Sequence, residues 1–210
     1  MNAILVHLVV SVISYLLGSL NFAIIISKMT YKKDIRDFGS GNAGSTNALR
    51  IMGVKKTIFV VLGDVLKTVI AVNISGHIAR SVPGANVHLA AALASAACIL
   101  GHTYPVFFGF RGGKGVLTTA AALACLDIRI FAIALPAFII VVAIKGFVSL
   151  GSIIAVWTIP LVHILFYGFN SERIEYLILF ISTAVFVTVL HRDNIKRLIA
   201  GTENKLKFKK

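Results

Sequence analysis

Charged residues are scarce in this chain: Asp, Glu, Lys and Arg make up 14% of its 210 residues, whereas hydrophobic residues make up 58%. Soluble domains average about 25% charged and about 45–50% apolar residues. Such a composition excludes an ordinary water-soluble domain, and the long apolar runs have the length of membrane-crossing helices. We therefore predict an all-α, polytopic membrane protein in which residues 1–210 form a single integral-membrane domain.

Acidic residues and cysteines are also few. The eight acidic residues are scattered between Asp34 and Glu203, so they form no carboxylate cluster that could hold a metal ion. The two cysteines, Cys98 and Cys125, lie in Ala-rich apolar stretches without the spacing of metal ligands. The sequence predicts no metal, no cofactor and no disulfide framework.

The 21 Lys and Arg residues give a net charge of +13, which raises the question of nucleic acid. A nucleic-acid binder spreads its cations over a solvated face, whereas nearly all of these lie in short segments between apolar runs. That pattern favours membrane topology and contact with lipid headgroups. We expect membrane lipid as a partner and no nucleic acid.

Seven apolar segments are candidates to cross the hydrocarbon, which takes about 20 helical residues. They are Ala3 to Ile26, Lys56 to Ala79, Val87 to Leu100, Val116 to Leu126, Ile128 to Ile144, Val148 to Phe169 and Ile174 to Leu190. The third and fourth are short, so re-entrant halves and a count of six or five are alternatives. We interpret the first as a retained span, because no basic segment precedes it and no cleavage pattern follows it.

The distribution of cations orients these spans, because cytoplasmic loops carry the excess of Lys and Arg. With seven spans and the N-terminus outside, seven cations in 28–56 and seven in 191–210 lie on the cytoplasmic side. The outer segments then hold only Arg80, Arg129 and Arg173. This bias favours seven crossings with a cytoplasmic C-terminus, and it predicts that the polar loops converge on one face.

Two glycine-rich segments interrupt the apolar runs. The first, GSGNAGSTNALR from Gly39 to Arg50, combines glycines with the hydrogen-bonding side chains of Ser40, Asn42 and Asn47. The guanidinium of Arg50 is suited to bidentate contact with phosphate. A helix N-cap would explain part of this pattern but needs fewer polar residues. We predict an anion site.

The second segment, GHTYPVFFGFRGGKG, ends at Gly115 and continues into an apolar helix. Backbone N–H groups at such a helix N-terminus, with Lys114 as a point charge, suit an anion. The segment is not a Walker A loop, because Phe108 and Gly115 stand where that motif needs Gly and then Ser or Thr. Hydrolysis of ATP or GTP is therefore disfavoured.

Ionisable residues also lie within an apolar segment. Asp64 and Lys67 are three residues apart and so share a helix face, and charges at membrane depth generally face a bundle interior or a cavity. The two are either a mutually neutralising pair or, for Lys67, a contact to substrate. His102, which precedes the turn at Pro105, is interpreted as a structural hydrogen-bonding group.

Further candidates lie at the cytoplasmic ends of later spans. Ser149 is either a helix N-cap or part of an inward-facing anion pocket. His191 and Asn194 are three apart and share a face if the last helix continues, and an interfacial His is a candidate proton acceptor near neutral pH. Lys196 and Arg197, which follow, fit an anchor to anionic lipid.

An anion site in a membrane protein fits a transporter, a channel or an enzyme. Transporters usually bind substrate near the midplane, between repeated and broken helices. Here the donor-rich segments gather at one surface and the sequence has no visible repeat. This favours an enzyme that joins a water-soluble phosphate compound to an apolar partner, with a transporter of a phosphate ester or phospholipid as the alternative.

The segments GSGNAGSTNALR, GHTYPVFFGFRGGKGV and HRDNIKRLIAGTE, in this order, resemble the three motifs of the bacterial acyl-phosphate:glycerol-3-phosphate acyltransferases of the PlsY type. The similarity covers nearly the whole chain. It implies transfer of a fatty acyl group from acyl phosphate to the 1-hydroxyl of glycerol 3-phosphate, which yields lysophosphatidic acid and inorganic phosphate in the first step of phospholipid synthesis. It further implies seven spans of the bacterial inner membrane, a site facing the cytoplasm, and an acyl-phosphate-producing enzyme as a candidate partner.

Matching by position, the resemblance implies roles for single residues. The catalytic residues would be Ser40, Arg50, His191 and Asn194. Substrate would be held by Lys114 with Gly112, Gly113 and Gly115, and by Ser149, while Glu203 would support the tail. From the residues themselves we add Asn42, Asn47 and Lys67 as substrate contacts and Asp64 and His102 as structural support.

Departures from the family pattern are small, at Ser45, Thr68 and Arg111, and none removes a charge or a key donor. Both substrates carry phosphate and repel each other, so cations and helix N-termini are needed to hold them together. Phosphate leaves readily from a mixed anhydride, so we expect direct attack by the glycerol hydroxyl. Either His191 or the substrate's own phosphate would take its proton.

Overall fold

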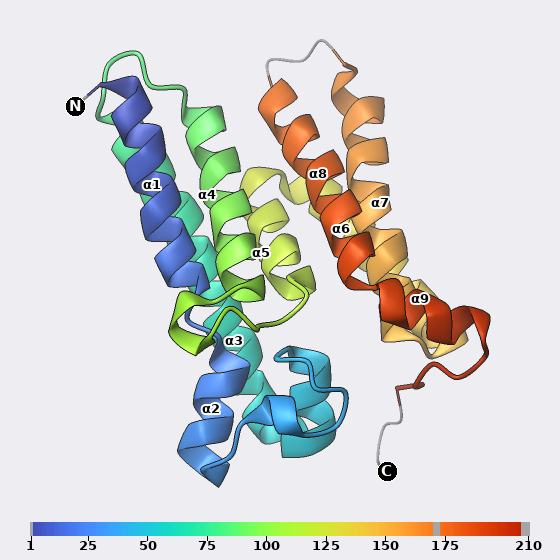
Figure 1. Ribbon diagram of the computed structural model, residues 1–210. Helices are drawn as coiled ribbons and strands as arrows, with labels where there is room; N and C mark the ends of the chain where they lie inside the picture. Colours follow the sequence, from blue (N-terminus) through green and yellow to red (C-terminus); the bar gives the residue numbers. More distant parts are fainter. Residues whose placement is uncertain (1, 170–172, 207–210) are drawn as a thin grey trace. The chain divides into compact units, whose positions relative to one another are not determined.

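The computed structural model describes residues 2–169 and 173–206, and in that part of the chain the regular structure is entirely helical (Figure 1). The chain divides after Leu126 into two compact units, residues 1–126 and 127–210, which are described separately. The predicted all-α fold is confirmed. The prediction of a single domain over residues 1–210 stays a prediction.

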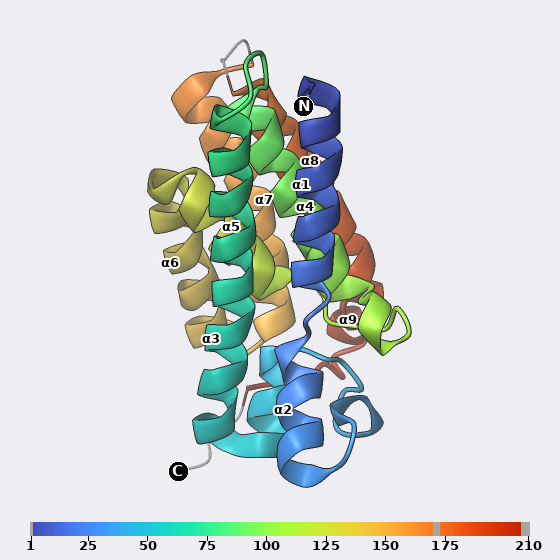
Figure 2. The ribbon, with the colours of Figure 1, turned by 90° about the vertical axis from the view of Figure 1, so that its left-hand side faces the viewer.

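The first unit is a helical bundle with two short 3-10 turns. Its elements are α1 Ala3–Gly18, α2 Phe22–Tyr31, η1 Ile35–Asp37, α3 Ser45–Arg80, α4 Val87–Thr103, η2 Val106–Phe108 and α5 Val116–Leu126. Helices α1, α3 and α4 run alongside one another and pack in all three pairs, as both views show (Figures 1 and 2). Two connections matter for function: η1 and the loop after it, and η2 and the loop after it.

The first predicted span is broken in the middle. Helix α1 ends at Gly18, and α2 begins only after Asn21, whose side-chain oxygen accepts a hydrogen bond from the Ile24 amide at 3.1 Å. The predicted span from Ala3 to Ile26 therefore consists of two helices, because a short polar side chain at position 21 caps a new helix. Residues 3–31 together are still apolar and long enough to cross a membrane.

Helix α3 begins at Ser45 rather than at the predicted Lys56, and it contains a break. At Gly53 the backbone has φ 73° and ψ 177°, a conformation that residues with a Cβ rarely adopt. The Thr57 hydroxyl donates to the freed carbonyl of Gly53 at 2.8 Å. The segment before the break therefore belongs to the glycine-rich motif, and the segment after it is the predicted span.

A small apolar core lies beneath the loop that follows η1. Ala23 and Ile24 of α2, Ile35 of η1, and Ala43 and Ala48 around the start of α3 are all fully buried and pack together. Burial of apolar surface favours this arrangement by about 25 cal/mol per Å². The core ties the first glycine-rich segment to α2 rather than leaving it as a free surface loop.

The second unit consists of α6 Ile128–Lys145, α7 Val148–Tyr167, α8 Ile174–Leu190 and α9 Arg192–Ile199. The predicted boundary at Asp127 is confirmed, because its carboxylate caps α6 by accepting from the Arg129 amide at 3.0 Å. The chain bends by 60° between α8 and α9. His191 lies at that bend, so the condition under which His191 and Asn194 would share a face, a last helix that continues through both, is not met.

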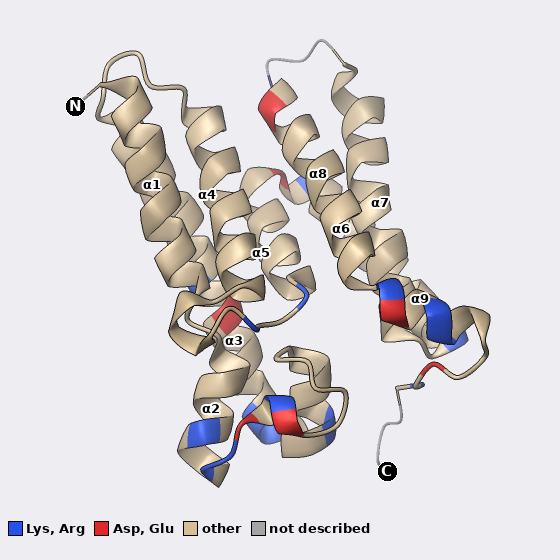
Figure 3. Ribbon diagram, viewed as in Figure 1, with Lys and Arg blue, Asp and Glu red and all other residues tan. Residues whose placement is uncertain are grey.

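The composition of the helices suits a lipid environment. Five helical segments in the described part of the chain are long and apolar enough to span a membrane, six if the bent pair α8 and α9 counts as one, and α5 is an apolar helix of 11 residues. Charged residues gather on α2 and η1 in the first unit and on α9 in the second (Figure 3). Seven crossings and an outside N-terminus stay predictions.

Candidate functional site

The loop between η1 and α3 carries the first motif, and a buried amide holds its shape. The Asn47 side chain, 1% exposed, accepts a hydrogen bond from the Ser40 amide at 3.0 Å. Its nitrogen donates to the carbonyls of Phe38 at 3.0 Å and Ile35 at 3.3 Å. Asn47 was predicted to contact substrate, but its side chain binds the chain's own backbone, and Ser40 is exposed on the loop so formed.

A second asparagine, missed by the sequence reasoning, anchors the same loop from outside it. The side chain of Asn21, fully buried at the break between α1 and α2, donates to the Ala43 carbonyl at 3.1 Å. A short polar residue between two apolar runs was the available signal. Helix α3 then starts with Gly44 as its N-cap and without a side-chain capping bond, so the motif's polar residues do not cap that helix. Asn42 is half-buried and Arg50 exposed.

The second glycine-rich segment is folded back onto the end of α4. The amide of Gly112 donates to the Thr103 carbonyl at 2.9 Å, and the amide of Gly113 donates to the His102 carbonyl at 3.1 Å. A Cβ on Gly112 would overlap the His102 carbonyl, and one on Gly113 would overlap the His102 ring. These two glycines are needed for close packing, and their amides are already bonded within the protein.

The groups of this segment that can still bind an anion, the Lys114 side chain and the start of α5, follow directly after Gly113. Lys114 is half-buried, and the carbonyl of Gly115 accepts from the Thr119 amide at 2.7 Å in the first turn of α5. The positive end of the α5 dipole therefore lies next to Lys114 in the chain. The structure also brings the two motifs together, since a Cβ on Gly113 would stand 2.8 Å from the Ala43 carbonyl of the first loop.

The predicted pair Asp64 and Lys67 is buried beneath these loops, together with His102. The Lys67 ammonium, with its side chain 2% exposed, lies 2.6 Å from the Asp64 carboxylate and 3.1 Å from Nδ1 of His102. It also donates to the Leu20 carbonyl at 2.9 Å, at the break between α1 and α2. Buried charges of this kind persist when paired and hydrogen-bonded. The geometry favours structural support for all three, and a substrate contact by Lys67 would have to break these bonds.

In the second unit, two predicted site residues, Ser149 and Asn194, converge with Arg197 on Glu203. Its carboxylate accepts from Ser149 at 2.8 Å, from Asn194 at 2.6 Å and from Nε of Arg197 at 2.7 Å. Ser149 is not the N-cap of α7, since Phe147 holds that position. Arg197, predicted only as a lipid anchor, is an ion-pair partner. Burial tends to raise the pKa of Glu203, but the bonds from Asn194, Arg197 and Ser149 outweigh it and lower the pKa.

His191, 4% exposed, lies at the bend between α8 and α9. Its Nδ1 is 2.8 Å from the Val187 carbonyl, which can only accept a hydrogen bond. Nδ1 therefore carries a hydrogen, and in the neutral ring the lone pair is on Nε2. This tautomer is the one that a general base acting through Nε2 requires.

The candidate site residues are divided between the two units. Ser40, Arg50 and Lys114 belong to the first, and His191 and Ser149 belong to the second. One shared site stays a prediction. Among residues 2–169 and 173–206, no three His, Cys, Asp or Glu side chains lie close enough together to hold a metal ion.

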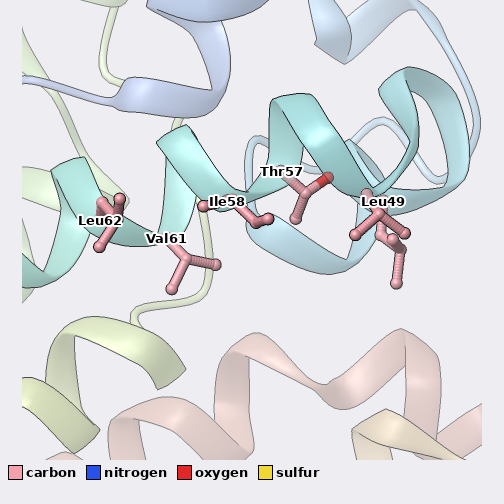
Figure 4. A pocket seen from close by; sticks show the side chains of 6 residues that line it. Leu49, Thr57, Ile58, Val61 and Leu62 are labelled. Carbon is pink, nitrogen blue, oxygen red and sulfur yellow. The ribbon is translucent and has the colours of Figure 1, made fainter.

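An apolar groove of about 200 Å³ lies along α3 (Figure 4). It is lined by Leu49, Val54, Thr57, Ile58, Val61 and Leu62. The one polar group among these side chains, the Thr57 hydroxyl, is bonded to the helix backbone. The groove therefore suits hydrocarbon rather than phosphate, and the polar chemistry belongs to the loops.

Comparison with known proteins places these motifs in a family. The family model described as Glycerol-3-phosphate acyltransferase matches residues 8–201. The chain belongs to the glycerol-3-phosphate acyltransferase family. The family's enzyme from Clostridioides difficile is 42% identical over 204 residues, with 97% of both chains covered. The one from Halalkalibacterium halodurans is 43% identical over 197 residues, with 94% of both covered.

Two crystal structures of PlsY (YgiH), an integral membrane glycerol 3-phosphate acyltransferase, resemble this fold. The glycerol 3-phosphate form matches with a TM-score of 0.85 and 32% identity, and 96% of both chains is covered. The lysophosphatidic acid form matches with a TM-score of 0.82 and 31% identity, over 96% of this chain and 95% of that one. The resemblance to the PlsY type is confirmed, and this acyltransferase is a multi-pass membrane protein.

Proposed function

We propose that this acyltransferase moves a fatty acyl group from acyl phosphate to the 1-hydroxyl of glycerol 3-phosphate, giving lysophosphatidic acid and inorganic phosphate. The observation that carries the proposal is the meeting of two glycine-rich motifs in the first unit, where Gly113 packs against Ala43. Related PlsY structures are described in a glycerol 3-phosphate form and a lysophosphatidic acid form, which correspond to the acceptor and a product of this reaction.

The chemistry is one displacement at the acyl carbon. The glycerol hydroxyl oxygen bonds to the carbonyl carbon, the bond from that carbon to the phosphate oxygen breaks, and phosphate leaves with the electron pair. The hydroxyl proton goes to Nε2 of His191 or to a phosphate oxygen of the substrate. No metal, nucleotide or cofactor takes part in this scheme.

The phosphate groups of the two substrates need separate binding sites that lie close together. We assign glycerol phosphate to Lys114 and the first-turn amides of α5, because the amides of Gly112 and Gly113 are bonded to α4. We assign Ser40 and Arg50 to the reacting phosphate and acyl carbon. Holding both reactants in place converts a bimolecular reaction into one within a complex, which is worth about 7–11 kcal/mol at best.

In the second unit, the Glu203 carboxylate accepts a hydrogen bond from the side-chain amide nitrogen of Asn194. This bond fixes the orientation of the amide and therefore of its carbonyl oxygen. Ser149 donates to the same carboxylate. We assign Asn194 and His191 to the reacting centre and Ser149 with Glu203 to their support. Activity in His191→Asn that equals the native activity over a broad pH range would exclude His191 as the base and leave the substrate phosphate.

We further propose that residues 1–210 act as one domain of the bacterial inner membrane, with seven spans, an outside N-terminus and the motifs facing the cytoplasm. The supporting observation is the concentration of cations in 28–56 and 191–210. An enzyme that produces acyl phosphate is the partner we expect there. Cysteines introduced at Asn42 and at the exposed Arg111, two residues before Gly113, should react only with a membrane-permeant reagent. Labelling by an impermeant reagent from outside intact cells would overturn the orientation.

The donor assignment is tested with purified protein in detergent, EDTA and glycerol 3-phosphate. Palmitoyl phosphate, palmitoyl-CoA and palmitoyl acyl carrier protein are compared in parallel as donors. We expect lysophosphatidic acid from palmitoyl phosphate alone. Turnover only with a thioester would overturn the donor assignment. Turnover in detergent also excludes the transporter alternative, because no compartments exist there.

A further inference from the structure

Arg36, in the short turn η1, joins the two glycine-rich loops. Its Nη1 donates to the carbonyls of Phe108 and Arg111, each at 2.7 Å, in the segment that leads to Lys114. Its Nε and Nη2 donate to the two oxygens of Asp34 at 2.9 and 2.8 Å. Arg36 itself lies three residues before the first motif, so its side chain links the turn that precedes that motif to the second motif.

This side chain is occupied by the protein rather than offered to a ligand. A guanidinium has five N–H donors, and the bonds to Asp34, Phe108 and Arg111 use four of them. The Arg36 and Asp34 side chains are only 18% and 17% exposed. The hydrogen bond from Arg36, which outweighs the effect of burial, lowers the pKa of Asp34 from 3.8 to about 2. The pair therefore remains ionised throughout the neutral range.

Each loop also has anchors of its own that do not involve Arg36. The first is held by Asn21 and Asn47, and the second by the carbonyls at the end of α4 that bind Gly112 and Gly113. Loss of Arg36 would therefore leave each loop close to its present shape. The loss would loosen the position of one loop relative to the other, which the packing of Gly113 against Ala43 and of Phe108 on the apolar core would then hold without a hydrogen-bonded link.

We propose that Arg36, fixed by Asp34, is a positioning residue that sets the catalytic loop of Ser40 relative to the loop of Lys114. The inference rests on the function proposed above, in which the two loops hold the two reactants. A misplacement of reacting groups by about 1 Å can cost about 100-fold in rate, even when the change is far from the chemistry. Arg36 acts through the carbonyls that it binds and touches neither substrate.

The test compares Arg36→Ala and Arg36→Lys with Lys28→Ala as the matched control. Lys28 is also paired with Asp34, at 3.4 Å, and its ammonium lies 5.8 Å from the centre of the Phe108 ring, but it donates to no carbonyl of the second loop in the described contacts. Steady-state kinetics with acyl phosphate and glycerol 3-phosphate give kcat and both KM values. Equilibrium dialysis of radiolabelled glycerol 3-phosphate counts the competent sites, so that kcat is expressed per site.

We expect kcat per competent site to fall about 10- to 100-fold in Arg36→Ala, with both KM values within about threefold of native. Arg36→Lys should lie between the two, because an ammonium can reach a carbonyl but cannot reproduce the planar fork. Lys28→Ala should stay within about twofold. If Arg36→Ala does not fold, the same comparison is made with Arg36→Lys and with Asp34→Asn. The second variant removes the carboxylate charge that holds the Arg36 guanidinium in place.

Two results would overturn the proposal. A loss of sites in proportion to activity, with kcat per site unchanged, would make Arg36 a folding residue only. A large rise in the KM for glycerol 3-phosphate with kcat retained would make it a substrate contact. Absence of turnover by the native protein with acyl phosphate would instead overturn the donor assignment, and the kcat ratio would then be measured with the donor that works.

Discussion

The two units build their polar sites in different ways. In the first, Asn21, Asn47 and Arg36 bind backbone carbonyls and amides, so side chains shape two loops. In the second, the side chains bind each other, with Glu203 at the centre of Ser149, Asn194 and Arg197. Function in the first unit should therefore depend on steric fit and backbone geometry, and in the second on the charge of one carboxylate.

The largest effect should come from filling the contact between the loops. Gly113→Ala places a methyl group against the His102 ring and 2.8 Å from the Ala43 carbonyl, and backbone cannot move aside cheaply. We expect kcat/KM to fall by more than about 100-fold. The control is Gly76→Ala on α3, where the nearest atom is a flexible Arg80 guanidinium nitrogen at 3.7 Å. Equal activities of the two variants would contradict the packing described for Gly113.

Removal of the Asn47 amide should have the next largest effect. Asn47→Ala removes the acceptor for the Ser40 amide and one of the two donors to each of the carbonyls of Phe38 and Ile35, which keep their backbone bonds. Each hydrogen bond lost costs about 0.5–1.5 kcal/mol. We expect a lower unfolding temperature and a clear loss of kcat/KM. Asn47→Asp keeps the acceptor for Ser40 but turns a carboxylate with no hydrogen to donate towards the two carbonyls, so it should lose at least as much activity. If both variants lose only affinity for substrate, Asn47 is a substrate contact, as the sequence predicted.

In the second unit, Glu203→Gln should have a smaller effect, of about 10-fold in kcat. The amide keeps one acceptor oxygen but cannot pair with the Arg197 cation, so Asn194 is held less firmly. The control is Asp193→Asn, which removes an exposed carboxylate next to Asn194 on α9 and should have nearly native activity. Similar losses in both variants would show that net charge, rather than the Glu203 network, is responsible.

The smallest predicted effect is a pH dependence of stability. Burial tends to raise the pKa of Glu203 in the folded state, but the hydrogen bonds that its carboxylate accepts outweigh burial and lower the pKa. Because its folded pKa is lowered, the ionised Glu203 carboxylate stabilises the fold at pH values above 4.5, its ordinary pKa. This contribution to stability is lost as the pH falls through the folded pKa. The unfolding temperatures of native protein and Glu203→Gln should therefore differ most above pH 4.5 and converge as the pH falls below 4.5 and through the folded pKa. A constant difference would contradict the lowered pKa.

The sequence predicted the helical segments well because hydrophobic runs and polar caps are local signals. The bounds of α5 and the cap at Asp127 follow from residues within a few positions. It did not predict the breaks at Asn21 and Gly53, although a short polar residue between two apolar runs was a local signal for the first. Ser149 and Asn194 were singled out from the residues themselves, whereas Glu203, which binds both, was singled out only through family resemblance.

The roles of the polar residues were harder to predict than their importance. Asn47 and the glycines at 112 and 113 look like phosphate ligands in sequence, yet their groups bond to nearby backbone. Arg36 was passed over because its partners Phe108 and Arg111 offer only backbone carbonyls, which every residue has. No pattern of side chains could reveal such a contact before the loops are placed in space.

The central claim is that acyl phosphate gives up its acyl group directly to glycerol 3-phosphate. The most direct test incubates the purified protein in detergent with radiolabelled palmitoyl phosphate and glycerol 3-phosphate, and counts both products over time. We predict that lysophosphatidic acid and inorganic phosphate form in equal amounts, and that neither enzyme-dependent product forms without the acceptor. Formation of lysophosphatidic acid without release of phosphate, or phosphate release without acyl transfer, would contradict the account.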